Sequence, residues 1–317
     1  MSSNPFIVQP DRYESQILSM WISGDGRRFH THGEVEGHEG VWNAKGQVQG
    51  IYDAPVKTTW KAGAFQDGAT QKGKKVLHRD LTLGFHCIET LGRTMEENES
   101  DFRKIFAYEV DEWDDNPEPI TLGIETEKSG VRMLDVLMYE NPVIESDIDP
   151  IKQQYLNLIL KLRAGQPMWY ETPVITEFSD GGADGVGFIE IENPTDQPMR
   201  HKWILTRAEW EIPDFSWRGK KYARKPGGAY RSRVLSIPPI TAVQGGAVIS
   251  LNKQDLMIRD AHYTNMLPLM NGRFFMHVIP PYTPKQQIPI SYKNAPAGGA
   301  MAQLIQPRLW SRPWGLE

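Results

Sequence analysis

Apolar and polar side chains alternate with a period of two along much of the chain, a pattern typical of β-strands with one buried face. The alternation is clearest between residues 77 and 87, where one face would carry Leu81, Leu83, Phe85 and Cys87. Residues 203–212 alternate in the same way and predict a strand with inward-facing Ile204, Ala208, Trp210 and Ile212. Residues 273–279 are apolar on both faces and predict a central strand of a β-sandwich, ended by Pro280-Pro281.

One segment follows a helical period instead. Thr94 and Glu97 have the spacing of a capping box, in which side chains at a helix start satisfy free backbone N–H groups. Apolar residues then recur three and four positions apart, at Phe102, Ile105 and Phe106. The pattern predicts one helix over residues 94–109, followed by an acidic turn. Strands are expected to resume over residues 120–125, 132–140 and 154–162, although the last also fits a short helix.

The pattern changes near Trp169–Pro173. Before this point lies a mixed segment that carries the helix, and after it short strands alternate with turn signals such as Gly181-Gly182 and Pro238-Pro239. A chain of 317 residues is long enough for two domains. We therefore predict a mainly β protein with an N-terminal β-barrel or sandwich over residues 1–170, with one helix near 94–109, and a C-terminal β-sandwich over residues 171–317.

Composition narrows the classes of function. The net charge of −5 supplies no basic field for nucleic acid, which disfavours a DNA-binding protein. The single cysteine, Cys87, excludes an intrachain disulfide and fits synthesis in a reducing cytoplasm. The first eight residues lack the basic and apolar regions of a signal peptide, and no apolar run reaches the ~18 residues of a membrane-spanning helix. We expect a soluble protein without membrane insertion.

Histidines and glutamates cluster between residues 30 and 38. On a strand, one face would carry a set of ligands that zinc accepts: His30, His32, Glu34, Glu36 and His38. A straight strand spaces such side chains ~6.5 Å apart, so several reach one ion only if Gly33 or Gly37 turns the chain. A polar, solvated hairpin is the favoured interpretation, and we predict no metal and no other cofactor.

Catalytic signals are weak. Two carboxylate pairs, Glu190 with Glu192 and Glu209 with Glu211, have a spacing that a glycosidase could use, and sugar rings could stack on Trp169, Trp203, Trp210 and Trp217. A chain with 40 acidic residues offers such pairs by chance, so solvated strand faces are favoured. The glycine-rich stretch 182–187 lacks the Lys-Ser/Thr pair of a phosphate loop, and Asp180 and Asp184 in the same loop fit a solvated turn better than a calcium site. No G-x-S-x-G motif occurs. We predict that the protein is not an enzyme and has no catalytic residue.

The chain ends in a tryptophan and proline cluster, Trp310-Ser311-Arg312-Pro313-Trp314. Chain ends usually fray, whereas proline removes backbone freedom and tryptophan carries a large apolar surface. We therefore expect this segment to dock, either on its own domain or on a neighbouring subunit. Our hypothesis assigns assembly or docking to Trp310, Pro313 and Trp314.

Four stretches share one resemblance. They are residues 63–70 with the strand at 78–83, the helix at 96–109 with the hairpin at 120–140, the turn at 189–198, and the end of the chain at 275–281 and 309–316. Together they resemble the distal tail proteins, a class of minor tail proteins, of siphophages that infect mycobacteria and other actinobacteria. The Trp-Ser-Arg-Pro-Trp-Gly string is the most specific of the four. The turn departs from the family pattern because Thr195–Pro198 lacks the usual glycine.

The resemblance implies a structural virion protein of the tail tip or baseplate, made in the host cytoplasm. It implies a ring-forming N-terminal β domain and a second sandwich that is galectin-like or similar to carbohydrate-binding modules. Six copies would form a hexameric ring between the tail tube protein and the central hub, with the tape measure protein as a further partner. Such a ring needs different surfaces on the two sides of each subunit. Its lumen must pass DNA, which suits an acidic rather than a basic protein.

Two other functions stay open at this point. The main alternative is a carbohydrate-binding tail-tip protein that recognises the host cell wall, with the tryptophans of the second half as sugar platforms. A cell-wall hydrolase is the weaker one, because no carboxylate pair stands out as a general acid and base.

Overall fold

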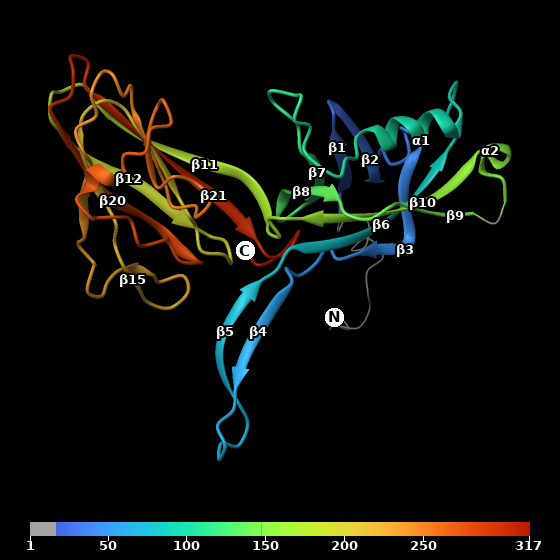
Figure 1. Cartoon of the computed structure of the whole chain (residues 1–317), viewed down its shortest axis with the longest axis horizontal. Coiled ribbons are helices and arrows are strands. Elements are labelled where there is room, and N and C mark those ends of the chain that lie inside the picture. Colours follow the sequence, from blue (N-terminus) through green and yellow to red (C-terminus); the bar gives the residue numbers. More distant parts are fainter. Residues whose placement is uncertain (1–16, 147) are drawn as a thin grey trace, which may run out of the picture. The chain divides into compact units, whose positions relative to one another are not determined.

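The computed structural model describes residues 17–146 and 148–317, so the N-terminal residues on which the signal-peptide prediction rests lie outside the described part. The chain forms two compact units. The first unit contains the residues up to Tyr170 and also the segment Ser311–Leu316, and the second unit contains Glu171–Trp310. The terminal segment, residues 311–316, thus belongs to the first unit, whereas the sequence division places it in the second. The prediction of a mainly β protein is confirmed (Figure 1).

Two antiparallel sheets form most of the first unit. One has the strand order β2-β1-β7-β8, built from β1 (Ser19–Gly24), β2 (Arg27–Gly33), β7 (Ile120–Thr126) and β8 (Gly130–Met138). The other has the order β3-β6-β10-β9, built from β3 (Val41–Gln49), β6 (Arg79–Ile88), β10 (Tyr155–Ala164) and β9 (Val143–Glu145). Strand β10 also pairs with β8 through Leu162 and Met138, which joins the sheets.

The strand predicted from residues 77–87 is β6, and its alternation is confirmed. All four of its predicted inward side chains are fully buried. Residues 154–162, which fit either a strand or a helix, belong to strand β10 and follow a single helical turn, α2 (Pro150–Gln153). The predicted strands at 120–125 and 132–140 are β7 and β8.

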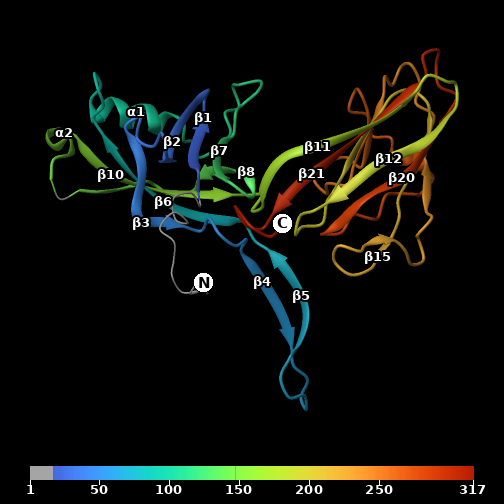
Figure 2. The same ribbon diagram turned by 180° about the vertical axis from the view of Figure 1, so that it is seen from behind.

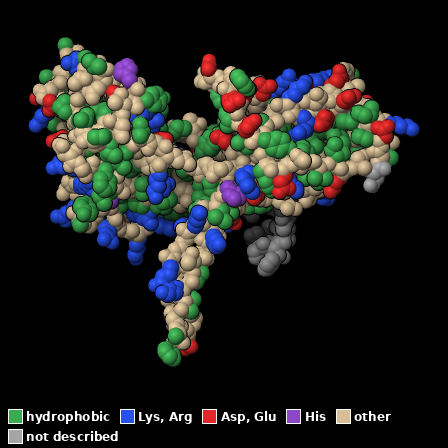
Figure 3. All heavy atoms as spheres, in the orientation of Figure 1, with side chains coloured by type: hydrophobic (Ala, Val, Ile, Leu, Met, Phe, Trp, Pro, Cys, Tyr) green, Lys and Arg blue, Asp and Glu red, His purple; other side chains and the backbone are tan. Residues whose placement is uncertain are grey.

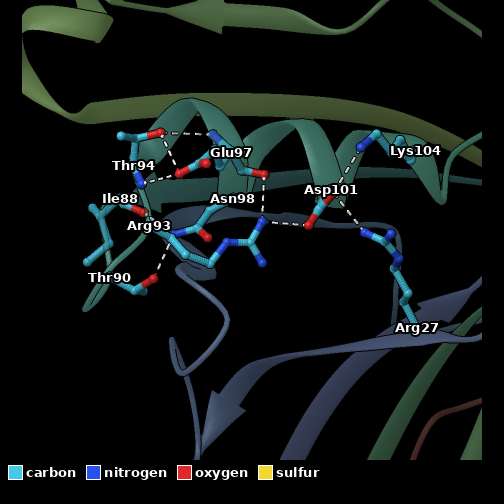
Figure 4. A network of polar contacts seen from close by, with 9 residues as sticks. All are labelled: Arg27, Ile88, Thr90, Arg93, Thr94, Glu97, Asn98, Asp101 and Lys104. Carbon is cyan, nitrogen blue, oxygen red and sulfur yellow. Dashed lines mark hydrogen bonds and ion pairs between the residues drawn. The ribbon is translucent and has the colours of Figure 1, made fainter.

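The predicted helix is α1 (Met95–Lys104), with the capping box of Thr94 and Glu97 in place. Figure 4 shows how the helix is fixed to its surroundings: Asp101 forms ion pairs with Arg27, Arg93 and Lys104. The prediction that the helix runs to residue 109 is wrong. The N–H of Phe106 bonds to the carbonyl oxygen of Arg103, a tight turn that ends the helix. The Phe106 ring packs edge to face against Phe102.

The second unit is a sandwich of two antiparallel sheets. One has the order β12-β20-β14-β17, built from β12 (Gly185–Asn193), β20 (Thr283–Lys293), β14 (Glu209–Pro213) and β17 (Val234–Ser236). The other has the order β19-β18-β13-β21-β11, built from β19 (Ile258–Asp260), β18 (Ala247–Ser250), β13 (Lys202–Leu205), β21 (Ala300–Trp310) and the later part of β11 (Trp169–Asp180). Short strands β15 (Trp217–Arg218) and β16 (Lys225–Pro226) and the 3-10 helix η2 (Leu267–Met270) lie in the connections. Trp203 and Trp210 are fully buried in one apolar cluster.

Two sequence predictions in this unit are wrong. Residues 203–212 are not one strand, because the chain passes from β13 in one sheet to β14 in the other, and Ile204 is consequently 36% exposed. Residues 273–279 form no strand. Instead, the buried carboxylate of Asp214 accepts hydrogen bonds from the backbone N–H groups of Met276 and His277, which holds this stretch in an irregular conformation.

Candidate functional site: a docked terminal segment and an exposed arm

The backbone of the terminal segment is held by a buried arginine of β6. Arg79 is 1% exposed, and its guanidinium donates to the carbonyl oxygen of Ser311 at 2.9 Å. The same guanidinium donates to four other carbonyl oxygens, those of Gly50, Ile51, Tyr52 and Pro167. Carbonyl dipoles thus replace the water that a buried cation loses. Burial lowers the pKa of Arg79 to about 10, so the group keeps its proton at neutral pH.

A second buried arginine, Arg132 of β8, holds the end of the same segment. Arg132 is fully buried, and it donates to the carbonyl oxygens of Arg312 at 3.1 Å and Gly315 at 3.0 Å. The N–H of Gly315 in turn donates to the Ser129 hydroxyl at 2.9 Å. The terminal segment is therefore bound mainly through its main chain, at both of its ends.

The side chains predicted to dock lie as follows. Pro313 is buried, and the Trp314 ring meets the Tyr52 ring edge to face with centroids 5.2 Å apart. Arg312 forms an exposed ion pair with Asp53. Trp310 is 2% exposed and ends β21 in the second unit. The segment docks on its own chain, and a role of these residues in assembly stays a hypothesis.

The hairpin of β4 (Val56–Lys61) and β5 (Thr70–Val76) is the most exposed element of the first unit. These two strands pair only with each other, and we call residues 56–76 the arm. Figures 1 and 2 show the arm extending away from the two sheets of its unit. Its tip is ordered, because Gln66 bonds to Gly63 and Thr70 and thereby presents a fully exposed Phe65.

The chemistry of the arm is basic and aromatic. It carries five lysines and one acid: Lys57, Lys61, Lys72, Lys74, Lys75 and Asp67. Figure 3 shows the basic side chains along the arm and apolar ones at its tip. Lys57 lies directly opposite Lys75 in the strand pairing, and Trp60 is 56% exposed. In the sequence, part of this stretch, residues 63–70, stands out only through its resemblance to phage tail proteins. The signal that could have identified it is a pair of strands with no apolar face.

The predicted sugar platforms and carboxylate pairs lie as follows. Trp169, Trp203 and Trp210 are fully buried, so their rings are not presented to a ligand. Glu190 forms an ion pair with Lys285, and Glu192 forms one with Arg308. Glu209 and Glu211 line a cavity of about 550 Å³ in the second unit, and Glu211 accepts a hydrogen bond from Ser291.

The remaining candidates are buried or contact other residues of their own unit. His30 bonds to Glu39 at 2.9 Å and His32 lies 3.3 Å from Glu36, and the described residues hold no group of three or more metal-ligating side chains. Cys87 is buried, which raises the pKa of its thiol to about 12. The side chains of Asp180 and Asp184 accept backbone hydrogen bonds from Gly182 and Asn294.

The turn that lacks the family's glycine is stabilised by Asn193. This buried amide donates to the carbonyl oxygens of Gln197, Ile279 and Pro280. Its carbonyl oxygen accepts from the Thr195 hydroxyl at 2.8 Å. A side chain therefore organises the turn without a glycine. Within the described residues, no helix is long and apolar enough to cross a membrane.

Comparison with known proteins relates the whole chain to phage tail proteins. The chain is 25% identical to minor tail protein Gp27 of Mycobacterium phage D29 and 24% identical to minor tail protein Gp27 of Mycobacterium phage L5. Each alignment covers 92% of this chain and 96% of the relative. These two proteins are homologues of the chain. No family model matches it.

Among solved structures, the chain is similar to the Dit (gp 19.1) protein of phage SPP1, described as a paradigm of the hub adsorption apparatus of phages that infect Gram-positive bacteria. The TM-score is 0.52 at 11% sequence identity, over 91% of this chain and 98% of that one. A chain of the phage P2 baseplate in its activated conformation with calcium gives a TM-score of 0.46 at 11% identity, over 92% and 97%. The similarity to the SPP1 protein supports a shared fold across both units.

Proposed function

We propose that the protein is a structural component of the tail tip of a siphophage, and that its copies associate head to tail into a closed ring. Its homologues carry the name minor tail protein, and its fold is that of a phage hub protein. The ring would join the tail tube protein on one side to the central hub and tape measure protein on the other. Such a role needs no catalysis.

The observation that carries this proposal is the arm. A two-stranded hairpin is only marginally stable alone in water, yet this one extends from its unit with Trp60 and Phe65 exposed. Like charges that face each other across a strand pair, as Lys57 and Lys75 do, destabilise it further. An element of this kind is expected to gain its stability from a partner. A closed ring supplies one, because each subunit offers one surface to the neighbour before it and a different surface to the neighbour after it.

The experiment compares the full chain with a variant in which residues 57–75 are replaced by Gly-Gly. Light scattering during gel filtration and negative-stain class averages should show rings for the full chain and monomers for the variant. Antibodies against the chain should label the tail end of the phage particles that contain it. A full chain that stays monomeric at every soluble concentration, together with label away from the tail end, contradicts the proposal.

The alternative of a cell-wall-binding module is not favoured. Of its predicted platforms in the second unit, Trp203 and Trp210 are fully buried and Trp217 is partly buried against the same apolar cluster. Tight binding of the purified chain to arabinogalactan or peptidoglycan would nevertheless establish a glycan-binding role.

A further inference from the structure

The first unit contains a groove lined by acidic side chains, whereas the arm is basic. It has a volume of about 800 Å³ and lies around the end of α1, the loop before β7 and the neighbouring part of β8. Apolar side chains line part of it, and six acidic residues also line it: Asp25, Glu109, Asp111, Asp114, Glu118 and Asp135. We call this the acidic groove.

Within the part of the chain that the structure describes, the acidic side chains of the groove form no ion pairs. None of the six forms an ion pair with any described residue, although several accept hydrogen bonds, as Asp135 does from Thr121 and Tyr170. Two cations line the groove, and each is bound elsewhere: Lys104 pairs with Asp101, and Arg163 pairs with Asp80. The groove therefore keeps a concentrated negative charge.

The five lysines of the arm carry the charge opposite to that of the acidic groove. None of them forms an ion pair with a described residue, and all lie on strands without a buried face. Residues 1–170 contain 27 acidic and 18 basic side chains, and the arm holds five of the basic and one of the acidic ones. The arm is thus a basic extension of a strongly acidic unit.

Arm and groove lie on opposite sides of the first unit. In Figures 1 and 2 the arm extends to one side of the sheets, while the loop between α1 and β7 extends to the other. Figure 3 shows acidic side chains gathered over that loop. This placement allows the arm of one copy to reach the groove of the next, as a head-to-tail arrangement requires.

We propose that the acidic groove is the receptor for the arm of a second copy of this chain. The inference rests on the proposed function and names the surface that its ring contact uses. The lysines of the arm meet the acidic rim, and an exposed aromatic side chain of the arm, Phe65 or Trp60, enters the apolar part. Aromatic side chains that fill a pocket inside a charged rim are the usual centre of a stable interface.

The test is a charge reversal on each side. The arm variant carries Lys72→Glu, Lys74→Glu and Lys75→Glu, and the groove variant carries Asp111→Lys, Asp114→Lys and Glu118→Lys. Because like charges across an interface cost several kcal/mol, each variant alone should associate at least ~100-fold more weakly than the wild type. A mixture of the two variants should assemble again, since each reversed arm then meets a reversed groove.

A matched control uses acids of the same loop that do not line the groove. Glu112→Lys with Asp115→Lys should leave association unchanged. In the wild-type oligomer, a zero-length carbodiimide reagent should cross-link arm lysines to groove carboxylates, and the cross-links should be absent from the monomer fraction. Circular dichroism verifies that every variant is folded.

The outcomes separate this inference from the proposed function. If the wild type forms rings and the two variants form them equally well, the arm binds elsewhere and the inference is wrong, while the ring stands. If the mixture fails to assemble although each variant is folded, charge pairing between arm and groove is also excluded. If the wild type never associates, the ring itself is contradicted.

Discussion

The arm and the terminal segment are both short, aromatic-bearing stretches of the first unit, but their surroundings differ. The terminal segment gives its carbonyl oxygens to Arg79 and Arg132 and places Trp314 against Tyr52. The two strands of the arm pair only with each other, and Phe65 at its tip is exposed to solvent. The aromatic content of a segment therefore does not decide whether it stabilises its own chain or recruits another. What decides it is whether buried polar partners exist for its backbone.

Removing the terminal segment is the strongest test of this difference. Deletion of residues 311–317 deprives two buried guanidiniums of carbonyl partners and should lower the free energy of unfolding of the first unit by about 4 kcal/mol. Denaturant titration measures the loss, and hydrogen exchange at β6 and β8 locates it. The control is Arg312→Ala, which removes an exposed ion pair worth at most about 1 kcal/mol and leaves the main chain of the segment in place. A truncated chain as stable as the full one contradicts the docking role.

Arg79→Met tests the same contact from the other side. The substitution removes one donor from five carbonyl oxygens, of which Ser311 keeps the Ala54 N–H and Ile51 keeps the Trp169 indole N–H, and we expect a loss of about 3 kcal/mol. The matched control is Arg163→Met, because Arg163 has its ion pair with Asp80 on the surface, and this substitution should lower the free energy of unfolding much less than Arg79→Met does. Equal effects of the two substitutions would mean that the buried hydrogen bonds of Arg79 contribute no more to the free energy of unfolding than an exposed ion pair does.

A change in pH should act on the second unit and spare the terminal segment. His201 is buried, and this burial lowers the pKa of its imidazole from 6.5 to about 4. The unfolded state therefore binds a proton more readily, and stability is lost as the pH falls from 6.5 towards 4. Between about pH 7.5 and about pH 5 the loss should be about 2 kcal/mol. His201→Leu should remove this part of the pH dependence and His262→Leu should keep it. Identical pH profiles for wild type and His201→Leu would disprove the assignment.

The aromatic contact between Trp314 and Tyr52 should contribute less to the stability of the first unit. Trp314→Ala should cost about 1 kcal/mol, since edge-to-face pairs contribute ~0.5–1.5 kcal/mol beyond area burial. A double-mutant cycle with Tyr52→Ala measures the coupling itself. A coupling of zero would assign the docking to the main chain alone.

The smallest effect on stability is expected in the arm. Phe65→Ser should change the free energy of unfolding by less than about 0.5 kcal/mol, because the side chain touches little of its own chain. Its effect should appear in association instead, as a lower oligomer fraction in light scattering. A large loss of stability in the monomer would show that the arm, like the terminal segment, supports its own unit.

The sequence predicts the fold where local periodicity and burial agree. Strand β6 and the capping box of α1 are examples, because their side chains alternate or recur with the period of the element. It fails at residues 203–212 and 273–279, where the structure is decided by sheet switching and by Asp214, 62 residues away from Met276 in the chain. Such long-range hydrogen bonds leave no periodic trace.

The candidate site was predicted only in part. The tryptophan and proline content of the terminal segment indicates docking, but the choice between its own domain and a neighbour depends on the buried Arg79 and Arg132. The alternation of β6 and β8 places both arginines on the inward face of their strands, but it does not show which carbonyl oxygens they bind. The arm shows the opposite limit. Its two strands have no apolar face, so a prediction based on alternating apolar side chains does not detect them.

The return of the terminal segment to the first unit has a consequence for synthesis. Domains usually fold in order as the chain leaves the ribosome. Here the first unit needs residues 311–316, which are made only after residues 171–310. Arg79 therefore lacks one of its five carbonyl partners, and Arg132 lacks those of Arg312 and Gly315, until the whole second unit has been translated. The unit that begins first is the one that is completed last.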